Sequence, residues 1–457
     1  MKELANKPLL TSLLLALPLW LIFDNFVVGA ILGLLAGFFI TMCISLHRLK
    51  HAPNPPTQTS SSMKPNAEVT TIPTPAGLPA LEANSAAHYQ NVVAAIQEKL
   101  RQQPDCFITF ETYMELALYA PGLGYYVAGS QKFPNPDAPG DFTTAPELTP
   151  VYGRAVAQQI AQVLRLSGSN HVLEFGAGSG ALAFSIITAL REMGIEPQYT
   201  IIEVSAELRE RQGERLNKLE ADVQWRDNLP RRFEGCVVAN EVLDAMPVSV
   251  FRWDENGQLM EKGVTLGTPF SWAERPASQE LAETISSRMP PLPGYTSEVN
   301  LRAEAWVGSL GQWLQKGAAI IIDYGFPRHE YYHPQRVQGT LMCHFRHHAH
   351  AEPLVYAGLQ DITAHVDFTA IADAALKAKL DVLGYTSQAR FLINTGFVNQ
   401  LAQTTETDAL DQARLMASAQ TLLSEAEMGE LFKVMVLGRE IDPPLIGFER
   451  GDRRHRL

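Results

Sequence analysis

The glycine-rich stretch at residues 174–180, EFGAGSG, is the clearest candidate ligand site in the sequence. An apolar run that predicts a strand precedes Gly176, Gly178 and Gly180, and a run that predicts a helix follows them. A glycine turn between a strand and a helix lets a ligand approach the backbone closely. Dinucleotide sites use G-x-G-x-x-G or its alanine variant, which residues 178–183 satisfy loosely. Sites for S-adenosylmethionine resemble E/D-x-G-x-G-x-G, which residues 174–180 match at every position.

Acidic residues at the ends of three predicted strands favour S-adenosylmethionine over a dinucleotide. Glu174 ends the first strand, where a carboxylate would repel a pyrophosphate but not a cationic amino acid and sulfonium. Glu203 ends the second strand and can accept hydrogen bonds from both ribose hydroxyls. Asp227 follows the third strand and is placed to meet the adenine amine. A glycine turn that binds no ligand is the structural alternative.

Two further carboxylates follow the fourth predicted strand, in NEVLDAMP at residues 240–247. Ligands of such sheets bind at the carboxyl ends of the strands. Glu241 and Asp244 are therefore the candidate catalytic pair, a clamp that orients a cationic substrate and disperses its charge as a proton leaves. In the alternative interpretation, Glu241 caps the next turn and Asp244 makes a structural hydrogen bond.

Other polar clusters are weaker candidates. Asp141 and Glu147 lie in loops rich in proline and glycine that are candidates for a lid, where either residue can meet the cofactor or the substrate or only cap a turn. Residues 297–300 are predicted to cap the following helix. The histidine-rich residues 343–350 predict a solvated or substrate-facing loop, and no metal site is expected. His365 is expected to pack or to start a helix.

Strand and helix patterns alternate from residue 170 to residue 440. The sequence predicts strands at 171–175, 198–205, 222–227, 235–241 and 317–325, with helices at 180–194, 206–220 and 301–314. This alternation implies parallel βαβ units. The predicted fold is therefore α/β, a doubly wound, mostly parallel sheet of the class I methyltransferase type with inserted helical and loop segments. A hairpin at 249–264 interrupts the alternation, and residues 430–440 are a candidate last, antiparallel strand. Residues 87–165 predict an N-terminal helical and lid region, with helices at 89–100 and 108–119.

The first 86 residues differ in composition from the rest. Residues 9–23 and 26–46 are apolar runs separated by Asp24-Asn25, and the second is about 31 Å long as a helix, roughly the thickness of a bilayer core. We expect a transmembrane helical hairpin at 1–50, with lysine and arginine at both ends on the cytoplasmic side. Residues 51–86, rich in Pro, Ser and Thr, predict a flexible tether to the soluble domain at 87–457.

Charge and cysteine content limit the classes of partner and site that the chain can have. The chain of 457 residues has a formal net charge of −12, which argues against nucleic acid as a partner and allows a basic protein. Four scattered cysteines form no C-x-x-C pair, so they signal neither a zinc site nor a disulfide framework.

From about residue 88 to residue 440, the chain resembles the MidA-type S-adenosylmethionine-dependent methyltransferases, the group that contains the mitochondrial complex I assembly methyltransferase. The resemblance rests on blocks in matching order: YMELALYAPGLGYY, GDFTTAPELTPVYG, LEFGAGSGALA, ANEVLDAMPV, PGYTSEVN, IIDYGF, GTLMCHFRHHAH and GLQDITAHVDFTAIADAA. Ala177 departs from the proline that is frequent in the family. The resemblance implies S-adenosylmethionine as cofactor and a protein arginine as substrate, with a subunit of a respiratory complex as the candidate protein.

The expected function is thus a methyltransferase held at the cytoplasmic face of the inner cell membrane. Two alternatives stay open at this point. One is an assembly scaffold that binds S-adenosylmethionine without turnover. The other is a nicotinamide-dependent oxidoreductase, against which Glu174 and the lack of a convincing His-Asp or Tyr-Lys pair count.

Overall fold

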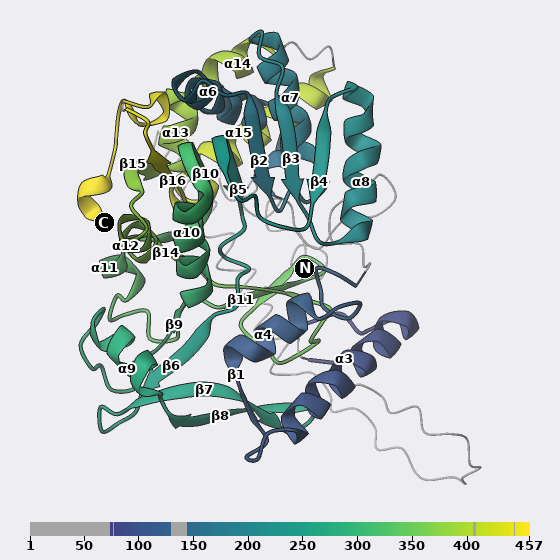
Figure 1. Ribbon diagram of the computed structural model, residues 1–457. Helices are drawn as coiled ribbons and strands as arrows, with labels where there is room; N and C mark the ends of the chain where they lie inside the picture. The colour runs from purple at the N-terminus through teal and green to yellow at the C-terminus, as the bar shows by residue number, and fades with distance from the viewer. Residues whose placement is uncertain (1–73, 76, 129–143, 405–407, 443) are drawn as a thin grey trace, which may run out of the picture. The chain divides into compact units, whose positions relative to one another are not determined.

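The computed structural model describes residues 74–75, 77–128, 144–404, 408–442 and 444–457 (Figure 1). All belong to one compact unit, Ile72–Leu457. The predicted membrane hairpin at 1–50, most of the predicted tether and Asp141 lie outside the described residues. The tether was predicted to reach residue 86, but helix α3 (Ala83–Arg101) already begins at Ala83. Within the part that the structure describes, none of the helices is long and apolar enough to cross a membrane.

An eight-stranded sheet forms the centre of this unit, in the order β15-β16-β10-β5-β2-β3-β4 with β14 beside β10. Its strands are β2 (His171–Phe175), β3 (Gln198–Ile202), β4 (Val223–Arg226), β5 (Phe233–Asn240), β10 (Leu314–Phe326), β14 (Val366–Asp367), β15 (Asp381–Ser387) and β16 (Phe432–Arg439). Only β16 runs antiparallel to its neighbours. The predicted mostly parallel sheet and its antiparallel last strand are confirmed.

Helices cover both faces of the sheet. Successive residues of its central strands point to opposite faces and are apolar on both, so each face needs a covering layer. Val238 and Ile320 pack with α6 (Pro150–Ser167) and α7 (Ala181–Glu192), whereas Val237 and Ile321 pack with α10 (Leu301–Trp313) and α12 (Phe368–Lys377). The first face also holds α13 (Gln388–Asn394), α14 (Phe397–Gln403) and α15 (Ala409–Leu423). Helix α8 (Ala206–Leu216) lies beside α7 and β4 (Figure 1).

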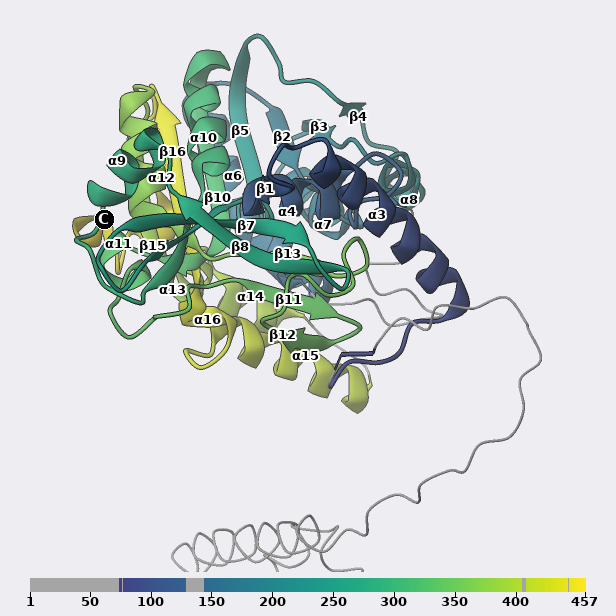
Figure 2. The same ribbon diagram turned by 90° about the horizontal axis from the view of Figure 1, so that it is seen from below.

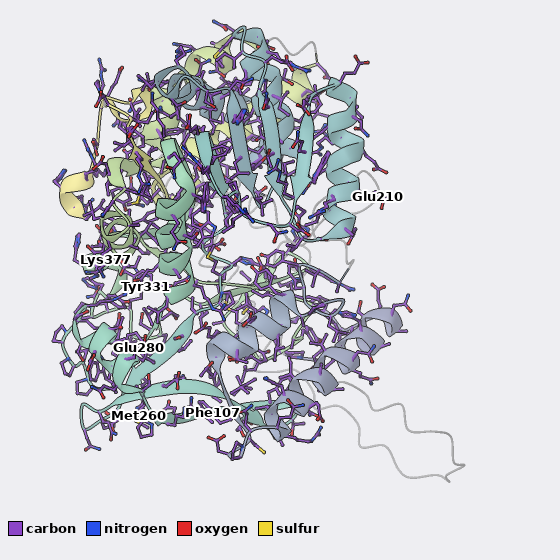
Figure 3. All side chains as sticks on the ribbon, in the orientation of Figure 1. Phe107, Glu210, Met260, Glu280, Tyr331 and Lys377 are labelled. Carbon is purple, nitrogen blue, oxygen red and sulfur yellow. The ribbon has the colours of Figure 1, made fainter. Side chains whose placement is uncertain are left out.

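A second part of the unit lies below the carboxyl ends of the parallel strands in Figure 1. It contains an antiparallel sheet, β1-β7-β6-β9 with β8 on β7, and a small sheet, β12-β11-β13. Its elements are α4 (Phe110–Tyr119), α9 (Gln279–Ser286), β1 (Phe107–Thr109), β6 (Ser249–Trp253), β7 (Leu259–Leu266), β8 (Phe270–Pro276), β9 (Thr296–Val299), β11 (Met342–Phe345), β12 (His348–His350) and β13 (Asp361–Thr363), together with α3. We call this part the insert. Figure 2 shows it from below, and in Figure 3 Phe107 and Met260 mark its sheet.

The insert agrees only partly with the sequence prediction. The hairpin at 249–264 is confirmed by the antiparallel β6–β7 pair. The helix predicted at 108–119 is shorter, because residues 107–109 pair with β7 as β1. Helix α4 then begins at Phe110, and the Thr109 side chain accepts the Thr112 N–H as its cap. A separate antiparallel sheet was not predicted.

Candidate functional site

The glycine loop joins the end of β2 to the start of α7, as predicted. Gly176, Gly178 and Gly180 have φ values of 62°, 54° and 80°, a region that L side chains rarely adopt. A Cβ on Gly176 would also lie 3.1 Å from Cγ2 of Val242. The loop therefore depends on glycine for its conformation, and at Gly176 it also has little room for a side chain.

Glu203 lies at the end of β3, where its carboxylate is held by two donors. It accepts hydrogen bonds from the Ser205 N–H at 2.9 Å and from Nε2 of Gln212 at 3.1 Å. Gln212, a fully buried residue of α8, also donates to the carbonyl of Gly178 at 3.0 Å and accepts from Nε1 of Trp225. Gln212 thus joins the glycine loop to the predicted ribose carboxylate. Gln212 was not among the predicted site residues, because its only signal in the sequence was a polar residue on the buried face of a helix.

Glu174, near the end of β2, lines a cavity that the glycine loop and Glu203 also line. Its side chain has a hydrogen-bond partner within the sheet. Its Oε2 accepts the Tyr199 hydroxyl at 2.8 Å. Burial raises the pKa of Glu174 to about 7, and the hydrogen bond from Tyr199 opposes part of that rise. Near neutral pH this carboxyl can therefore be charged or neutral, and a nearby positive ligand would favour the charged form.

Glu147, in the short helix α5 (Ala145–Leu148), lines the cavity but is already paired. Ser179 of the glycine loop donates to its carboxylate, and Nη1 of Arg215 lies 3.3 Å from it. This arrangement attaches α5 to the glycine loop and to α8, and contact of Glu147 with the cofactor or the substrate remains a prediction. Asp227 is exposed, accepts a hydrogen bond from its neighbour Asn228 and is not among the residues lining the cavity. Its role in binding adenine remains a prediction.

Glu241 follows β5 in a left-handed conformation, with φ of 53°. This conformation is uncommon for residues other than glycine and is often found at functional sites. Asn240 donates to Oε1 of Glu241 at 3.0 Å and is itself held by the Tyr152 hydroxyl at 2.7 Å. Burial and the nearby charge of Asp244 raise the pKa of Glu241 to about 8.

Asp244 is 5% exposed and lies three residues further along the same loop. Its Oδ2 accepts the Tyr324 hydroxyl, and its Oδ1 is buried with no hydrogen-bond partner among the described residues. Burial raises the pKa of Asp244 to about 6. The loop itself is fixed by Asp323, whose Oδ2 accepts the N–H groups of Val242, Leu243 and Asp244 at 2.9 to 3.3 Å. Asp323, in β10, therefore acts as a structural acceptor for this loop.

The insert closes the cavity opposite the sheet. Tyr119 and Tyr126 are stacked, with ring centroids 5.5 Å apart, and Tyr126 donates to Oδ1 of Asp361 at 2.7 Å. Tyr119 donates to the carbonyl of Ala245, next to Asp244, at 2.9 Å. Asp361 was not a candidate from the sequence, because its position in the cavity depends on contacts between distant segments.

Two histidines, His344 and His365, also line the cavity. The ring of His365 stacks on Phe326 at 5.3 Å and meets the edge of Tyr324 at 5.0 Å, and burial lowers the pKa of His365 to about 4. His365 is therefore uncharged at neutral pH. It packs as expected, and it also lines the cavity. His344 lines the cavity as well, and burial lowers its pKa. The segment at 343–350 was predicted to be a loop, but it forms the antiparallel pair β11–β12.

Two other predictions concern structural roles. Asn300 accepts the Ala303 N–H at 2.9 Å and caps α10, as expected for residues 297–300. Glu298 in the same segment is fully buried and accepts the N–H groups of Thr340 and Leu341. Among the residues that the structure describes, no cluster of three or more His, Cys, Asp or Glu is arranged to hold a metal ion.

A cavity of about 820 Å³ lies between the sheet and the insert. The glycine loop and Glu203 line it together with Glu241, Asp244 and Asp361. Six of its described lining residues carry carboxylates: Glu147, Glu174, Glu203, Glu241, Asp244 and Asp361. Its described lining includes no lysine and no arginine. The cavity therefore suits ligands that carry positive charge.

Comparison with known proteins agrees with this geometry. Residues 155–386 match a family model described as "Putative S-adenosyl-L-methionine-dependent methyltransferase". The chain belongs to this family. The resemblance predicted from the sequence blocks is thereby confirmed, and the cofactor is S-adenosylmethionine.

Relatives of the chain include proteins of known structure and curated enzymes. A structure from Burkholderia thailandensis, solved with S-adenosyl-homocysteine bound, is 46% identical, with a TM-score of 0.78 over 83% of this chain and 100% of that chain. The mitochondrial protein arginine methyltransferase NDUFAF7 homologue of Drosophila melanogaster is 27% identical over 74% of this chain and 84% of its own length. The Danio rerio protein arginine methyltransferase NDUFAF7 is 28% identical over 71% and 82%.

The residues present fit S-adenosylmethionine. The glycine loop brings backbone to the cavity where a side chain would obstruct it, and Glu203 is fixed with lone pairs left for ribose hydroxyls. When bound, the cofactor supplies a methyl group on a positively charged sulfur. The acidic cavity wall is compatible with that charge, whereas it would repel the pyrophosphate of a dinucleotide.

Proposed function

We propose that this methyltransferase transfers the methyl group to the guanidinium of a protein arginine. The observation that supports the proposal best is the charge of the cavity. Glu241, Asp244 and Asp361 line it beyond the glycine loop, and this acidic wall suits a substrate that carries positive charge. A guanidinium would supply that positive charge and up to five N–H donors.

The two predicted catalytic carboxylates have complementary properties. Asp244 is held by Tyr324 and by a loop that Asp323 fixes, so it can orient a guanidinium N–H. Burial raises the pKa of Glu241 to about 8, but a guanidinium bound beside it would favour the charged carboxylate. In that form Glu241 can accept the proton that leaves as the nitrogen–carbon bond forms. A guanidinium is a poor nucleophile while protonated, so a nearby proton acceptor is required in addition to alignment.

Relatives support the choice of arginine. The curated relatives from Drosophila and Danio are named protein arginine methyltransferases, at 27% and 28% identity. A subunit of a respiratory complex is the substrate that the sequence resemblance implied. We also propose that the substrate is met at the cytoplasmic face of the inner membrane, on the basis of the apolar runs and flanking cations predicted at residues 1–50.

The test compares methylarginine in cells that express the full chain with cells that express Asp244→Asn or no chain. Mass spectrometry of membrane and soluble fractions should find methylated arginine peptides that depend on the wild-type chain and are enriched in the membrane fraction. Methylation confined to soluble proteins would contradict the proposed location only. Tight cofactor binding without any dependent methylarginine would contradict the enzyme activity and favour a scaffold.

A further inference from the structure

Asp361 is a buried carboxylate that has no role yet in the proposed action of Glu241 and Asp244. It lies in β13 of the insert, is 5% exposed and lines the cavity together with Glu241 and Asp244. Its strand is tied to the catalytic loop, because the N–H of Ala364 donates to the carbonyl of Asp244 at 3.0 Å. A third negative charge is thus brought close to the other two by a separate part of the chain.

An aromatic pair holds this carboxylate in place. The Tyr126 hydroxyl donates to Oδ1 of Asp361 at 2.7 Å, and the ring of Tyr126 stacks on Tyr119. The Tyr119 hydroxyl is fixed in turn by the carbonyl of Ala245. The position of Asp361 is therefore linked to the loop that carries Asp244 by two tyrosines and by the backbone.

Electrostatics agree with this proximity. The charge of Asp361 contributes to the raised pKa values of Glu241, Tyr119 and Tyr126. Three carboxylates that line one cavity repel one another, and a bound cation relieves this repulsion. A planar guanidinium can donate to several acceptors at once, whereas the compact ammonium of lysine is less suited to such an arrangement.

We propose that Asp361 positions the substrate. It binds the arginine guanidinium from the side of the insert, while Asp244 and Glu241 bind it from the side of the sheet. The inference rests on the proposed function. It adds that the insert, as well as the methyltransferase sheet, selects arginine.

The experiment measures steady-state kinetics of the full-length enzyme with an arginine-containing peptide, and calorimetric affinity for S-adenosylmethionine. Asp361→Asn should raise the KM for the peptide by about tenfold or more, since it removes a charged acceptor, while the cofactor Kd stays within about twofold. Tyr126→Phe, which keeps the charge but removes its orienting donor, should raise the peptide KM by a smaller factor. Asp222→Asn is the control, because Asp222 is an exposed acid next to the start of β4, at the sheet edge opposite the cavity.

A second measurement uses methylguanidine as the probe. It should bind the cofactor-loaded wild type in calorimetry and compete with the peptide, and Asp361→Asn should weaken that binding by a similar factor. An unchanged peptide KM and unchanged methylguanidine affinity in a folded Asp361→Asn protein would overturn the inference, as would a lower melting temperature with no change in either affinity. If the wild type methylates no arginine, the proposed function fails, whereas methylguanidine affinity still reports on Asp361.

Discussion

Nε2 of Gln212 lies 3.1 Å from the Glu203 carboxylate and 3.0 Å from the carbonyl of Gly178, so one side chain fixes both the acid at the end of β3 and the glycine loop. Glu203 and Gln212 are nine residues apart in the sequence. The turn between them joins the end of β3 to the start of α8, whose buried face carries Gln212. The cofactor site is therefore held by three segments rather than by the glycine motif alone.

Replacing Glu203 tests the ribose assignment. Glu203→Ala should weaken S-adenosylmethionine binding by about 100-fold, because two hydrogen bonds to a charged acceptor are lost. Isothermal titration calorimetry provides the measurement. Glu207→Ala, at an exposed acid in the first turn of α8, should leave the affinity unchanged. Equal affinities for Glu203→Ala and the wild type would show that the ribose assignment is wrong.

Paired alanine substitutions separate backbone strain from a direct effect on the site. Gly176→Ala imposes a positive φ of 62° and places a Cβ 3.1 Å from Val242, so it should destabilise the fold by about 1–3 kcal/mol and also weaken cofactor binding. Gly194→Ala imposes a φ of 77° where no atom lies within 4 Å of the new Cβ. It should lower the melting temperature and leave cofactor affinity intact. Urea denaturation and calorimetry measure the two effects, and equal cofactor losses in both variants would contradict the prediction.

Glu241 should make stability depend on pH in the cofactor-free protein. Its pKa is about 8 in the folded state against an ordinary value of 4.5, so between these values the folded state binds a proton that the unfolded state has lost. The stabilisation is present below about pH 4.5 and is lost as pH rises to 8, by at most about 1.4 kcal/mol per pH unit. Glu241→Gln should be less sensitive to pH than the wild type in urea denaturation at pH 5.5 and 7.5. Parallel pH dependence of the two proteins would refute the prediction.

Tyr324 should act through Asp244. Its hydroxyl donates a hydrogen bond to the Asp244 carboxylate. Burial raises the pKa of Asp244 to about 6, and this hydrogen bond keeps the pKa from rising further. Tyr324→Phe should therefore leave Asp244 more protonated at pH 7, lower kcat/KM for an arginine peptide by about tenfold and shift the rising limb of the pH–rate profile to higher pH. Tyr385→Phe is the matched control, because the buried Tyr385 hydroxyl has no hydrogen-bond partner among the described residues. An unshifted profile in Tyr324→Phe would exclude this role.

The position of the glycine loop, Glu174 and Glu203 at one edge of the sheet could be predicted from the sequence, because the signals for it are local. The glycines, Glu174 and Glu203 lie at the junctions of short strands and helices, and the order of the strands brings those junctions to one edge. Glu241 and Asp244 were found for the same reason. Glu147 was placed near the cavity correctly, but its pairing with Arg215 depends on a helix 68 residues away.

The insert side could not be predicted in this way. Tyr126 and Asp361 are 235 residues apart, and Tyr119 and Ala245 are 126 residues apart, so no motif spacing connects them. The antiparallel sheet was missed because β1 has only three residues and pairs with a strand more than 150 residues away. Such contacts are set by packing of the whole unit, which the sequence pattern alone does not reveal.

Transfer of tritium from methyl-labelled S-adenosylmethionine to a purified arginine-containing protein substrate, followed by amino-acid analysis, tests the central claim most directly. The account predicts label in methylarginine with the wild-type chain, and a loss of at least about tenfold with Asp244→Asn at unchanged cofactor affinity. Label in lysine, in carboxyl groups or in no protein residue, with the cofactor fully bound, would contradict it.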